Sequence, residues 1–254
     1  MKPLLIDLDG VLRLGTSPAP GLKDFISFLE VTKRPACIIS NSTRTNSELL
    51  LDFFNNISIK LKFPIMTAAD VTYSYVKNNY KKVVVYASDV VKNMLRDFRD
   101  MKSPEAVIIG DLGSEWNFQI LNEIFNYVID GCDIIAMHKN RYWRIPEKGY
   151  VLDAGPFVTA IEYAANRESK LIGKPSSVYF NSALRVLGYS EGEPFIMIGD
   201  DVETDIKGAA DLDGETILIY TGKTKYPLEK KAIITPDHEA KDLVEAIKIL
   251  RKIN

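Results

Sequence analysis

The sequence predicts an α/β protein, in which a doubly wound, Rossmann-like parallel sheet carries a smaller inserted α/β unit. Short apolar runs alternate along the chain with segments whose apolar residues recur at helical spacing. This alternation favours parallel strands joined by right-handed crossovers. In addition, polar residues suited to one chemical task follow several of these runs near both ends of the chain, but not in its middle.

The first expected strand is the apolar run at residues 3–6, which leads into Asp7, Leu8, Asp9 and Gly10. A short apolar run without polar alternation is typical of a strand buried on both faces. Side chains two apart on a strand share a face, so Asp7 and Asp9 are expected to project together. Because the two carboxylates repel each other, the end of this strand is a candidate site for a divalent metal and phosphate. The alternative is an ordinary strand-to-turn signal, for which an Asp-Gly pair is also typical.

The outer parts of the chain continue the alternation. After the first strand, we expect helices at 21–33, 45–54 and 68–78 and strands at 35–39 and 63–66. Near the other end, we expect helices at 176–187, 202–212 and 240–253 and strands at 195–199, 216–220 and 232–235. These segments together predict a core domain formed by residues 1–70 and 170–254.

Residues 71–169 predict the inserted unit. Its expected strands are 83–86, 106–109 and 133–137, and its expected helices are 90–98, 118–129 and 156–166. A polar, turn-rich segment at 138–153 separates the last strand from the last helix. No acidic pair follows any of these strands, so this unit is not expected to carry the metal site.

Three polar sets follow expected strands of the core: Asp7 with Asp9, Ser40 with Asn41, and Asp200 with Asp201. Ligands of open parallel sheets bind beyond the carboxyl ends of the strands, so these sets are expected at one edge. Lys174 precedes a helix start, where a lysine can bind phosphate. Singly, each has an ordinary explanation: Ser40 as a helix cap, Asp201 and Asp205 as acidic residues at a helix start, and Lys174 as a solvated loop residue. Their common placement favours one phosphate and metal site.

Composition excludes several function classes. The chain has 254 residues, of which 46% are hydrophobic and 26% are charged, with a net charge of −2. These values are typical of a globular protein and suggest neither nucleic acid nor a membrane surface as partner. Cys37 and Cys132 lie in apolar runs, and Met1-Lys2 leads directly into the first strand without room for a signal peptide. We therefore expect a cytoplasmic protein.

These motifs resemble those of the haloacid dehalogenase superfamily of phosphatases. The similarity lies in Asp7-Leu8-Asp9-Gly10-Val11, Ser40-Asn41, Lys174-Pro175 and residues 199–205. The insertion between the second and third motifs resembles that of the NagD-like branch, which has a large α/β cap. Residues 138–142 and 155–164 resemble the subgroup that contains phospholysine phosphohistidine inorganic pyrophosphate phosphatase. Val11 departs from the threonine of many members, but it lies outside the carboxylate pair.

The resemblance implies a Mg²⁺-dependent phosphatase that hydrolyses a small phosphorylated metabolite. It implies that Asp7 is the nucleophile and Asp9 the general acid and base. Mg²⁺ would be bound by the Asp7 carboxylate, the Asp9 main-chain carbonyl and Asp200. The resemblance also implies that Asp201 and Asp205 orient metal-bound water without binding the metal themselves. It implies that Ser40, Asn41 and Lys174 bind the phosphoryl oxygens.

Three other functions are alternatives to a phosphatase. They are a phosphotransferase or phosphomutase on the same core, a receiver-type signalling module, and a non-catalytic phosphate-binding protein. A receiver module would be near half this length and would not need the insertion.

Within the cap, His138, Lys139, Arg141 and Tyr142 are candidates for substrate specificity. A solvated hairpin or a dimer surface is the alternative for this segment, and related caps often mediate homodimers.

Overall fold

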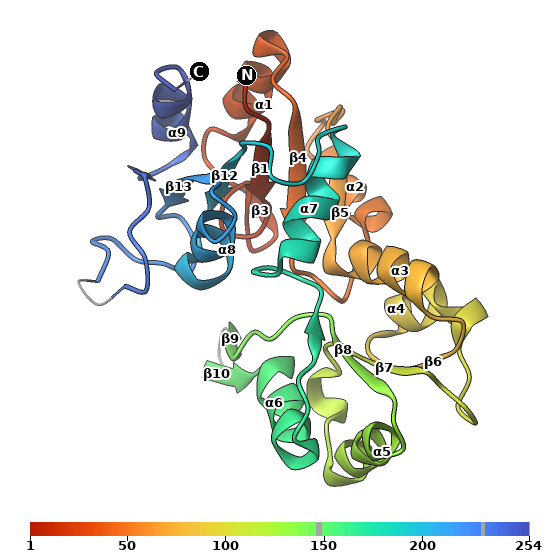
Figure 1. The fold of residues 1–254 in the computed structure, drawn as a ribbon. Coiled ribbons are helices and arrows are strands. Elements are labelled where there is room, and N and C mark those ends of the chain that lie inside the picture. Colours follow the sequence, from red (N-terminus) through yellow and green to blue (C-terminus); the bar gives the residue numbers. More distant parts are fainter. Residues whose placement is uncertain (146–148, 230–231, 254) are drawn as a thin grey trace. The chain divides into compact units, whose positions relative to one another are not determined.

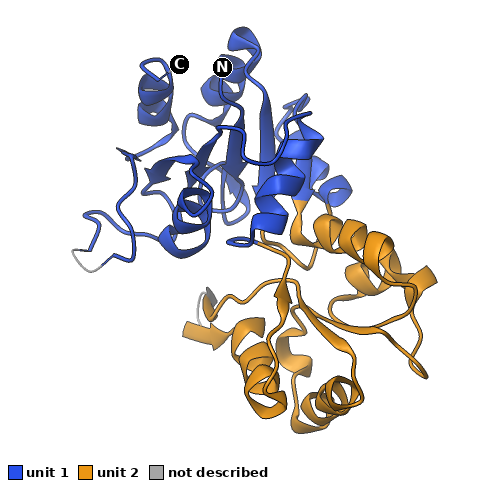
Figure 2. Cartoon of the chain, in the orientation of Figure 1, with its two compact units in different colours: residues 1–40, 47–66, 174–254 blue, residues 41–46, 67–173 orange. Residues whose placement is uncertain are grey.

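The computed structural model describes residues 1–145, 149–229 and 232–253. It confirms the predicted α/β class (Figure 1). The described residues form two compact units, shown in different colours in Figure 2. Unit 1 comprises residues 1–40, 47–66 and 174–254, and unit 2 comprises residues 41–46 and 67–173. Within the described residues, no helix combines the length and the apolar character needed to cross a membrane.

Unit 1 is built on a sheet of six strands in the order β14-β13-β12-β1-β4-β5. Strand β1 lies beside β12 and β4 and pairs in parallel with both, and the sheet continues in parallel through β13 and β14. The strand bounds are Leu4–Asp7 for β1, Ala36–Ser40 for β4, Ile65–Thr67 for β5, Ile196–Gly199 for β12, Glu215–Ile219 for β13 and His238–Ala240 for β14.

Helices cover both faces of this sheet. The face that carries Leu4 and Ile6 packs in one apolar cluster with buried residues of α1 (Leu22–Thr32), α2 (Ser47–Asn56) and α9 (Leu243–Leu250). Helix α7 (Ser177–Val186) contacts β4, and helix α8 (Lys207–Ala210) contacts β13. Because β1 is sandwiched, its residues Leu4 to Ile6 are fully buried, as its unbroken apolar run predicts.

Three details of unit 1 differ from the expectations. The predicted strand at 232–235 is wrong, because the last strand is β14, three residues further on. The predicted helix at 202–212 is a π-helical turn, η3 (Val202–Ile206), followed by α8. A two-stranded ribbon of β2 (Arg13–Leu14) and β3 (Ser17–Pro18) follows β1.

Unit 2 has a parallel sheet in the order β11-β8-β7-β6. Its apolar cluster joins this sheet to α5 and α6, whose inward residues include Ile124, Val128, Val158 and Ile161. The strands are β6 (Val83–Tyr86), β7 (Ala106–Ile109), β8 (Asp133–Ala136) and β11 (Lys170–Leu171). The helices are α3 (Ala68–Asn79), α4 (Asp89–Met94), η1 (Arg96–Phe98), η2 (Gly113–Glu115), α5 (Phe118–Ile129) and α6 (Ala154–Ala165).

Two features of unit 2 lie outside the strands and helices expected for it. The turn-rich segment at 138–153 contains an antiparallel hairpin of β9 (Tyr142–Ile145) and β10 (Gly149–Leu152). Residues 41–46 belong to this unit, because Thr43 and Arg44 are bound to it. The Ser88 hydroxyl donates to the Thr43 carbonyl at 2.7 Å, and Arg44 Nε lies 3.2 Å from Asp111 Oδ2.

Candidate active site

Three buried carboxylates gather at the carboxyl ends of β1 and β12. Asp7 is the last residue of β1, Asp200 follows β12, and Asp205 lies in η3. One carboxylate oxygen from each of these three residues lies within 4.8 Å of the other two. Lys174, which is only 3% exposed, forms ion pairs with Asp7 and with Asp205, the latter at 2.7 Å. The fold therefore brings together residues from three distant parts of the sequence.

Burial and the proximity of like charges shift the pKa values of the groups in this cluster. Burial raises the pKa of Asp7 well above its usual range, and the nearby carboxylates raise it further, while Lys174 opposes them. Burial, followed by repulsion from Asp205, raises the pKa of Asp200 to about 7. Burial alone would lower the pKa of Lys174, but its ion pairs with Asp205 and Asp7 raise it well above its usual value. Lys174 therefore remains charged.

The donor set fits a hard divalent cation. All three side chains are carboxylates, which are the ligands that Mg²⁺ prefers, and a cation among them would relieve their repulsion. Asp205, which was expected only to orient metal-bound water, lies within this set and contacts Lys174 directly.

The loop after β13 fixes the Asp200-Asp201 pair. The Lys223 N–H donates to Asp200 Oδ2 at 2.5 Å, and the Lys223 ammonium lies 2.5 Å from Asp201 Oδ2. Burial would raise the pKa of Asp201, but the Lys223 ion pair outweighs it and lowers this pKa. A Cβ on Gly222 would lie 1.9 Å from Asp200 Oδ2, so only glycine allows the loop to pass this close.

Ser40, at the end of β4, is held by a tyrosine. The Tyr179 hydroxyl accepts the Ser40 N–H at 3.0 Å and lies 2.7 Å from the Ser40 carbonyl oxygen. The Ser40 hydroxyl donates to Asp9 Oδ2 at 3.2 Å. Asn41, the next residue, belongs to unit 2, where a Cβ on Gly173 would lie 2.5 Å from its side-chain oxygen.

Asp9 does not continue the strand alternation. Strand β1 ends at Asp7, and Asp9 lies in the following turn with its side chain half exposed. Its carboxylate contacts Arg13 and Ser40, whereas Asp7 contacts Lys174. The two aspartates therefore have different partners, which is consistent with different chemical tasks.

The candidate specificity residues of unit 2 have different surroundings. His138 is buried, and its Nδ1 accepts the Asn140 N–H at 3.3 Å. Lys139 forms an ion pair with Glu162 at 2.7 Å. Arg141 and Tyr142 are exposed, and the Tyr142 ring packs edge-on against Tyr150 with centroids 5.3 Å apart.

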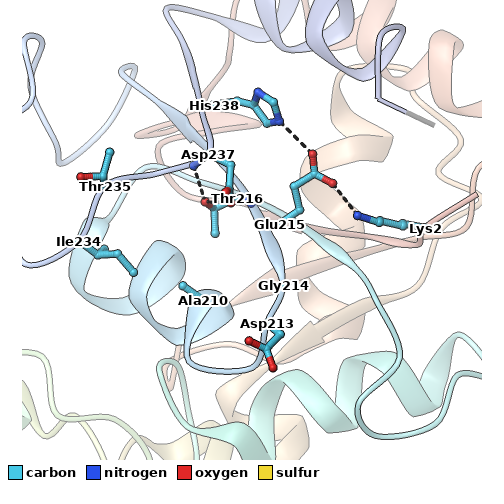
Figure 3. A pocket seen from close by; sticks show the side chains of 10 residues that line it. All are labelled: Lys2, Ala210, Asp213, Gly214, Glu215, Thr216, Ile234, Thr235, Asp237 and His238. Carbon is cyan, nitrogen blue, oxygen red and sulfur yellow. Dashed lines mark hydrogen bonds and ion pairs between the residues drawn. The ribbon is translucent and has the colours of Figure 1, made fainter.

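A separate polar pocket lies at the amino ends of β13 and β14 (Figure 3). Because β1, β12, β13 and β14 run in parallel, this pocket is at the opposite edge of the sheet from Asp7. Glu215 is bound by both Lys2 and His238, at 2.8 and 2.9 Å, and Asp237 accepts the N–H and hydroxyl of Thr216. These groups bind one another, and none of the residues predicted for the phosphate and metal site lines this pocket.

Sequence reasoning missed three residues of the site: Arg13, Tyr179 and Lys223. For Lys223 a signal existed, because it follows an expected strand of the core just as Asp200 does. Tyr179 lies on the inner face of an amphipathic helix, so its pattern is that of a core residue. Arg13 has no distinctive pattern, because a turn brings it to Asp9.

Comparisons with known proteins agree with this geometry. The family model for haloacid dehalogenase-like hydrolases matches residues 4–99, and a related HAD-hydrolase-like model matches residues 171–246. Human haloacid dehalogenase-like hydrolase domain-containing protein 2 is 32% identical over 234 residues, covering 91% of this chain and 88% of the relative. Human phospholysine phosphohistidine inorganic pyrophosphate phosphatase is 26% identical over 98% of this chain and 94% of its own length.

Solved structures have the same fold. The p-nitrophenyl phosphatase from Archaeoglobus fulgidus superposes with a TM-score of 0.88 at 22% identity and covers 98% of both chains. NagD from E. coli K-12 superposes with a TM-score of 0.84 at 21% identity, covering 96% of this chain and 98% of NagD. The chain therefore belongs to the haloacid dehalogenase-like hydrolase family. Its fold is that of NagD and of the p-nitrophenyl phosphatase, in agreement with the motifs.

Proposed function

We propose that this protein is a Mg²⁺-dependent phosphatase that hydrolyses a small phosphorylated metabolite through an aspartyl-phosphate on Asp7. The main support is the buried cluster of Asp7, Asp200 and Asp205 with Lys174 at the carboxyl edge of the sheet. Mg²⁺ would be held by the Asp7 carboxylate, the Asp9 main-chain carbonyl and Asp200. When bound, it supplies positive charge that reduces the repulsion between a carboxylate nucleophile and a phosphate.

In the first half of the reaction, an Asp7 oxygen attacks phosphorus and the bond to the leaving oxygen breaks. Asp9 gives a proton to this oxygen unless the leaving group is stable as an anion. Lys174, Ser40 and the Asn41 amide stabilise the charge on the phosphoryl oxygens. Lys174 suits this task because it stays charged in a buried place.

In the second half, a water molecule attacks the phosphorus of the aspartyl-phosphate. Asp9 accepts a proton from this water as the bond between Asp7 and phosphorus breaks. Asp201 and Asp205 would orient the water molecules bound to the cation. Inorganic phosphate is then the product, which distinguishes this reaction from transfer to a second substrate in a phosphotransferase or phosphomutase.

The substrate is proposed only as a class. The core residues bind phosphate, so discrimination has to come from other residues, and Lys139, Arg141 and Tyr142 are the candidates with polar groups near the surface of unit 2. His138 is buried and would act by shaping this segment. Phosphosugars, nucleotides, phosphoamino acids and pyrophosphate form the test panel, and unit 2 is also the proposed surface for a homodimer in the cytoplasm.

The test is release of inorganic phosphate from p-nitrophenyl phosphate and from this panel, with Mg²⁺ and with chelator. We expect turnover with Mg²⁺ and none with chelator. Asp7→Asn is expected to abolish turnover, because an amide is a poor nucleophile, provided that mass spectrometry excludes deamidation. Full activity of Asp7→Asn or of the chelated enzyme would refute the proposal.

A further inference from the structure

The turn after β1 returns the chain to Asp9 within four residues. The Gly10 N–H donates to the Arg13 carbonyl at 2.8 Å, and the Arg13 N–H donates to the Leu8 carbonyl at 2.9 Å. Gly10 has a φ of +98°, which favours glycine. The backbone itself therefore places Arg13 beside Asp9.

The side chain of Arg13 binds the Asp9 carboxylate. Its Nε and Nη2 atoms donate to Asp9 Oδ1 at 2.9 and 2.6 Å, and the Ser40 hydroxyl donates to Oδ2 at 3.2 Å. Hydrogen bonds from a guanidinium to a carboxylate are charge-assisted and directional. Both oxygens of the Asp9 carboxyl group therefore have a fixed hydrogen-bond donor.

The guanidinium is also held by a group other than Asp9. Its central carbon lies 5.4 Å from the centroid of the Phe53 ring, within range of a cation–π contact. Phe53 in turn packs edge-on against Phe54, with centroids 5.1 Å apart, and Phe54 is fully buried in the core. Arg13 is therefore fixed by the turn and by Phe53, whereas the Asp9 side chain is half exposed.

We propose that Arg13 is a positioning residue that holds Asp9 as the general base for hydrolysis of the aspartyl-phosphate. This inference rests on the proposed function. In that step the water oxygen bonds to phosphorus, the bond from Asp7 to phosphorus breaks, and Asp9 takes the proton from water. Arg13 keeps the accepting carboxylate in place and does not itself exchange a proton. With p-nitrophenyl phosphate the first step needs no proton, because p-nitrophenolate leaves as an anion, so loss of Arg13 should slow only the second step.

Rapid mixing of Arg13→Met with p-nitrophenyl phosphate and Mg²⁺ tests this. We expect a burst of p-nitrophenolate that approaches one per active site, followed by a steady rate at least about tenfold below the parent. This is part of the roughly 10²–10⁴-fold contribution of an acid–base group. Intact-protein mass after acid quenching should show one added phosphoryl group. Arg13→Lys, which keeps the charge but loses the paired N–H groups, should recover part of the rate.

Two further variants provide the controls. Arg185→Met removes a guanidinium from an exposed pair with Glu191 at 3.6 Å in the same unit, and it should behave like the parent. Phe53→Leu leaves Arg13 and Asp9 in the chain but removes the ring under the guanidinium. It should give the same burst with a smaller loss of rate, and this keeps the inference testable if Arg13→Met does not fold.

Asp9→Asn separates this inference from the proposed function. If Asp9→Asn accumulates phosphoenzyme while Arg13→Met and Phe53→Leu turn over at the parent rate without a burst, the role of Arg13 is overturned and the proposed function stands. If Arg13→Met slows the steady rate further in the Asp9→Asn background, Arg13 does not act through Asp9, and the inference is also overturned. If the parent releases no phosphate and no variant is phosphorylated, both fail.

Discussion

Replacing Asp200 with asparagine should stabilise the metal-free protein while removing its function. Asp200 is buried beside Asp205, and its pKa is raised from 3.8 to about 7. A raised pKa means that the folded state holds the proton more tightly than the unfolded chain. The carboxylate therefore destabilises the fold increasingly as pH rises from about 4, and the full effect is present above about pH 7.

The magnitude follows from this shift. About three pKa units correspond to about 4 kcal/mol of unfolding free energy at pH 8, at 1.36 kcal/mol per unit. The NH₂ group of asparagine is a donor that the carboxylate lacks, and burying it returns part of the gain. We therefore expect Asp200→Asn to be more stable than the parent by about 2–4 kcal/mol at pH 8 in chelator. At pH 5, where the parent Asp200 is mostly protonated, the gain should fall by more than half.

Urea denaturation in chelator at both pH values, followed by circular dichroism, measures this difference. Asp201→Asn is the matched control, because Lys223 lowers the pKa of Asp201 and the ionised form therefore stabilises the fold. It should be less stable than the parent at pH 8. Addition of Mg²⁺ should stabilise the parent by mass action, and much less so Asp200→Asn. If Asp200→Asn in chelator is no more stable than the parent at pH 8, the carboxylate cluster is not strained and the reasoning is wrong.

Three further results are expected. Asp9→Asn should lower turnover by about 10²–10⁴-fold, since it removes an acid–base group. A fall in turnover of less than tenfold would argue against the role of Asp9. The metal affinity of this variant, measured by calorimetry, should stay near that of the parent because the main-chain carbonyl is kept. Ca²⁺ should inhibit in steady-state assays with Mg²⁺, because its larger coordination number favours binding both oxygens of Asp7, and activation by Ca²⁺ would contradict this. Arg141→Ala should change the rates for large substrates but not for p-nitrophenyl phosphate; equal changes for both, with an altered mass in solution, would instead indicate a dimer surface.

The fold was predictable because its signals are local and repeated. Each buried strand of the core is an unbroken apolar run, and sheet topology then brings their carboxyl ends together. Applied to the sequence, this rule identifies Asp7 and Asp200, whereas Lys174 was predicted from its place before a helix start. The structure shows the ion pair between Asp7 and Lys174. The errors arose where the signal was weak. The segment at 232–235 has a strand-like composition. The strand that pairs with β13 nevertheless begins at His238, which pairs with Ile217.

Side-chain partners were less predictable than strand ends. The sequence places Asp7 and Asp9 two residues apart, which on a continued strand would put them on one face. Gly10 instead turns the chain, so that Asp9 meets Arg13. The assignment of residues 41–46 to unit 2 has a similar cause. It depends on contacts of Thr43 and Arg44 with residues more than forty positions away, which no local pattern encodes.

This assignment affects how the insertion can be exchanged or removed. Unit 2 is not a single continuous insert, because residues 41–46 belong to it although they are flanked by unit 1. A chimaera that replaces only residues 67–173 with the equivalent part of a relative would leave Thr43 and Arg44 facing foreign residues in place of Ser88 and Asp111. The residue before this segment is Ser40, so a mismatch there would disturb the core site itself. Evolutionary or engineered replacement of the insertion must therefore carry residues 41–46 with it as a second, matched piece.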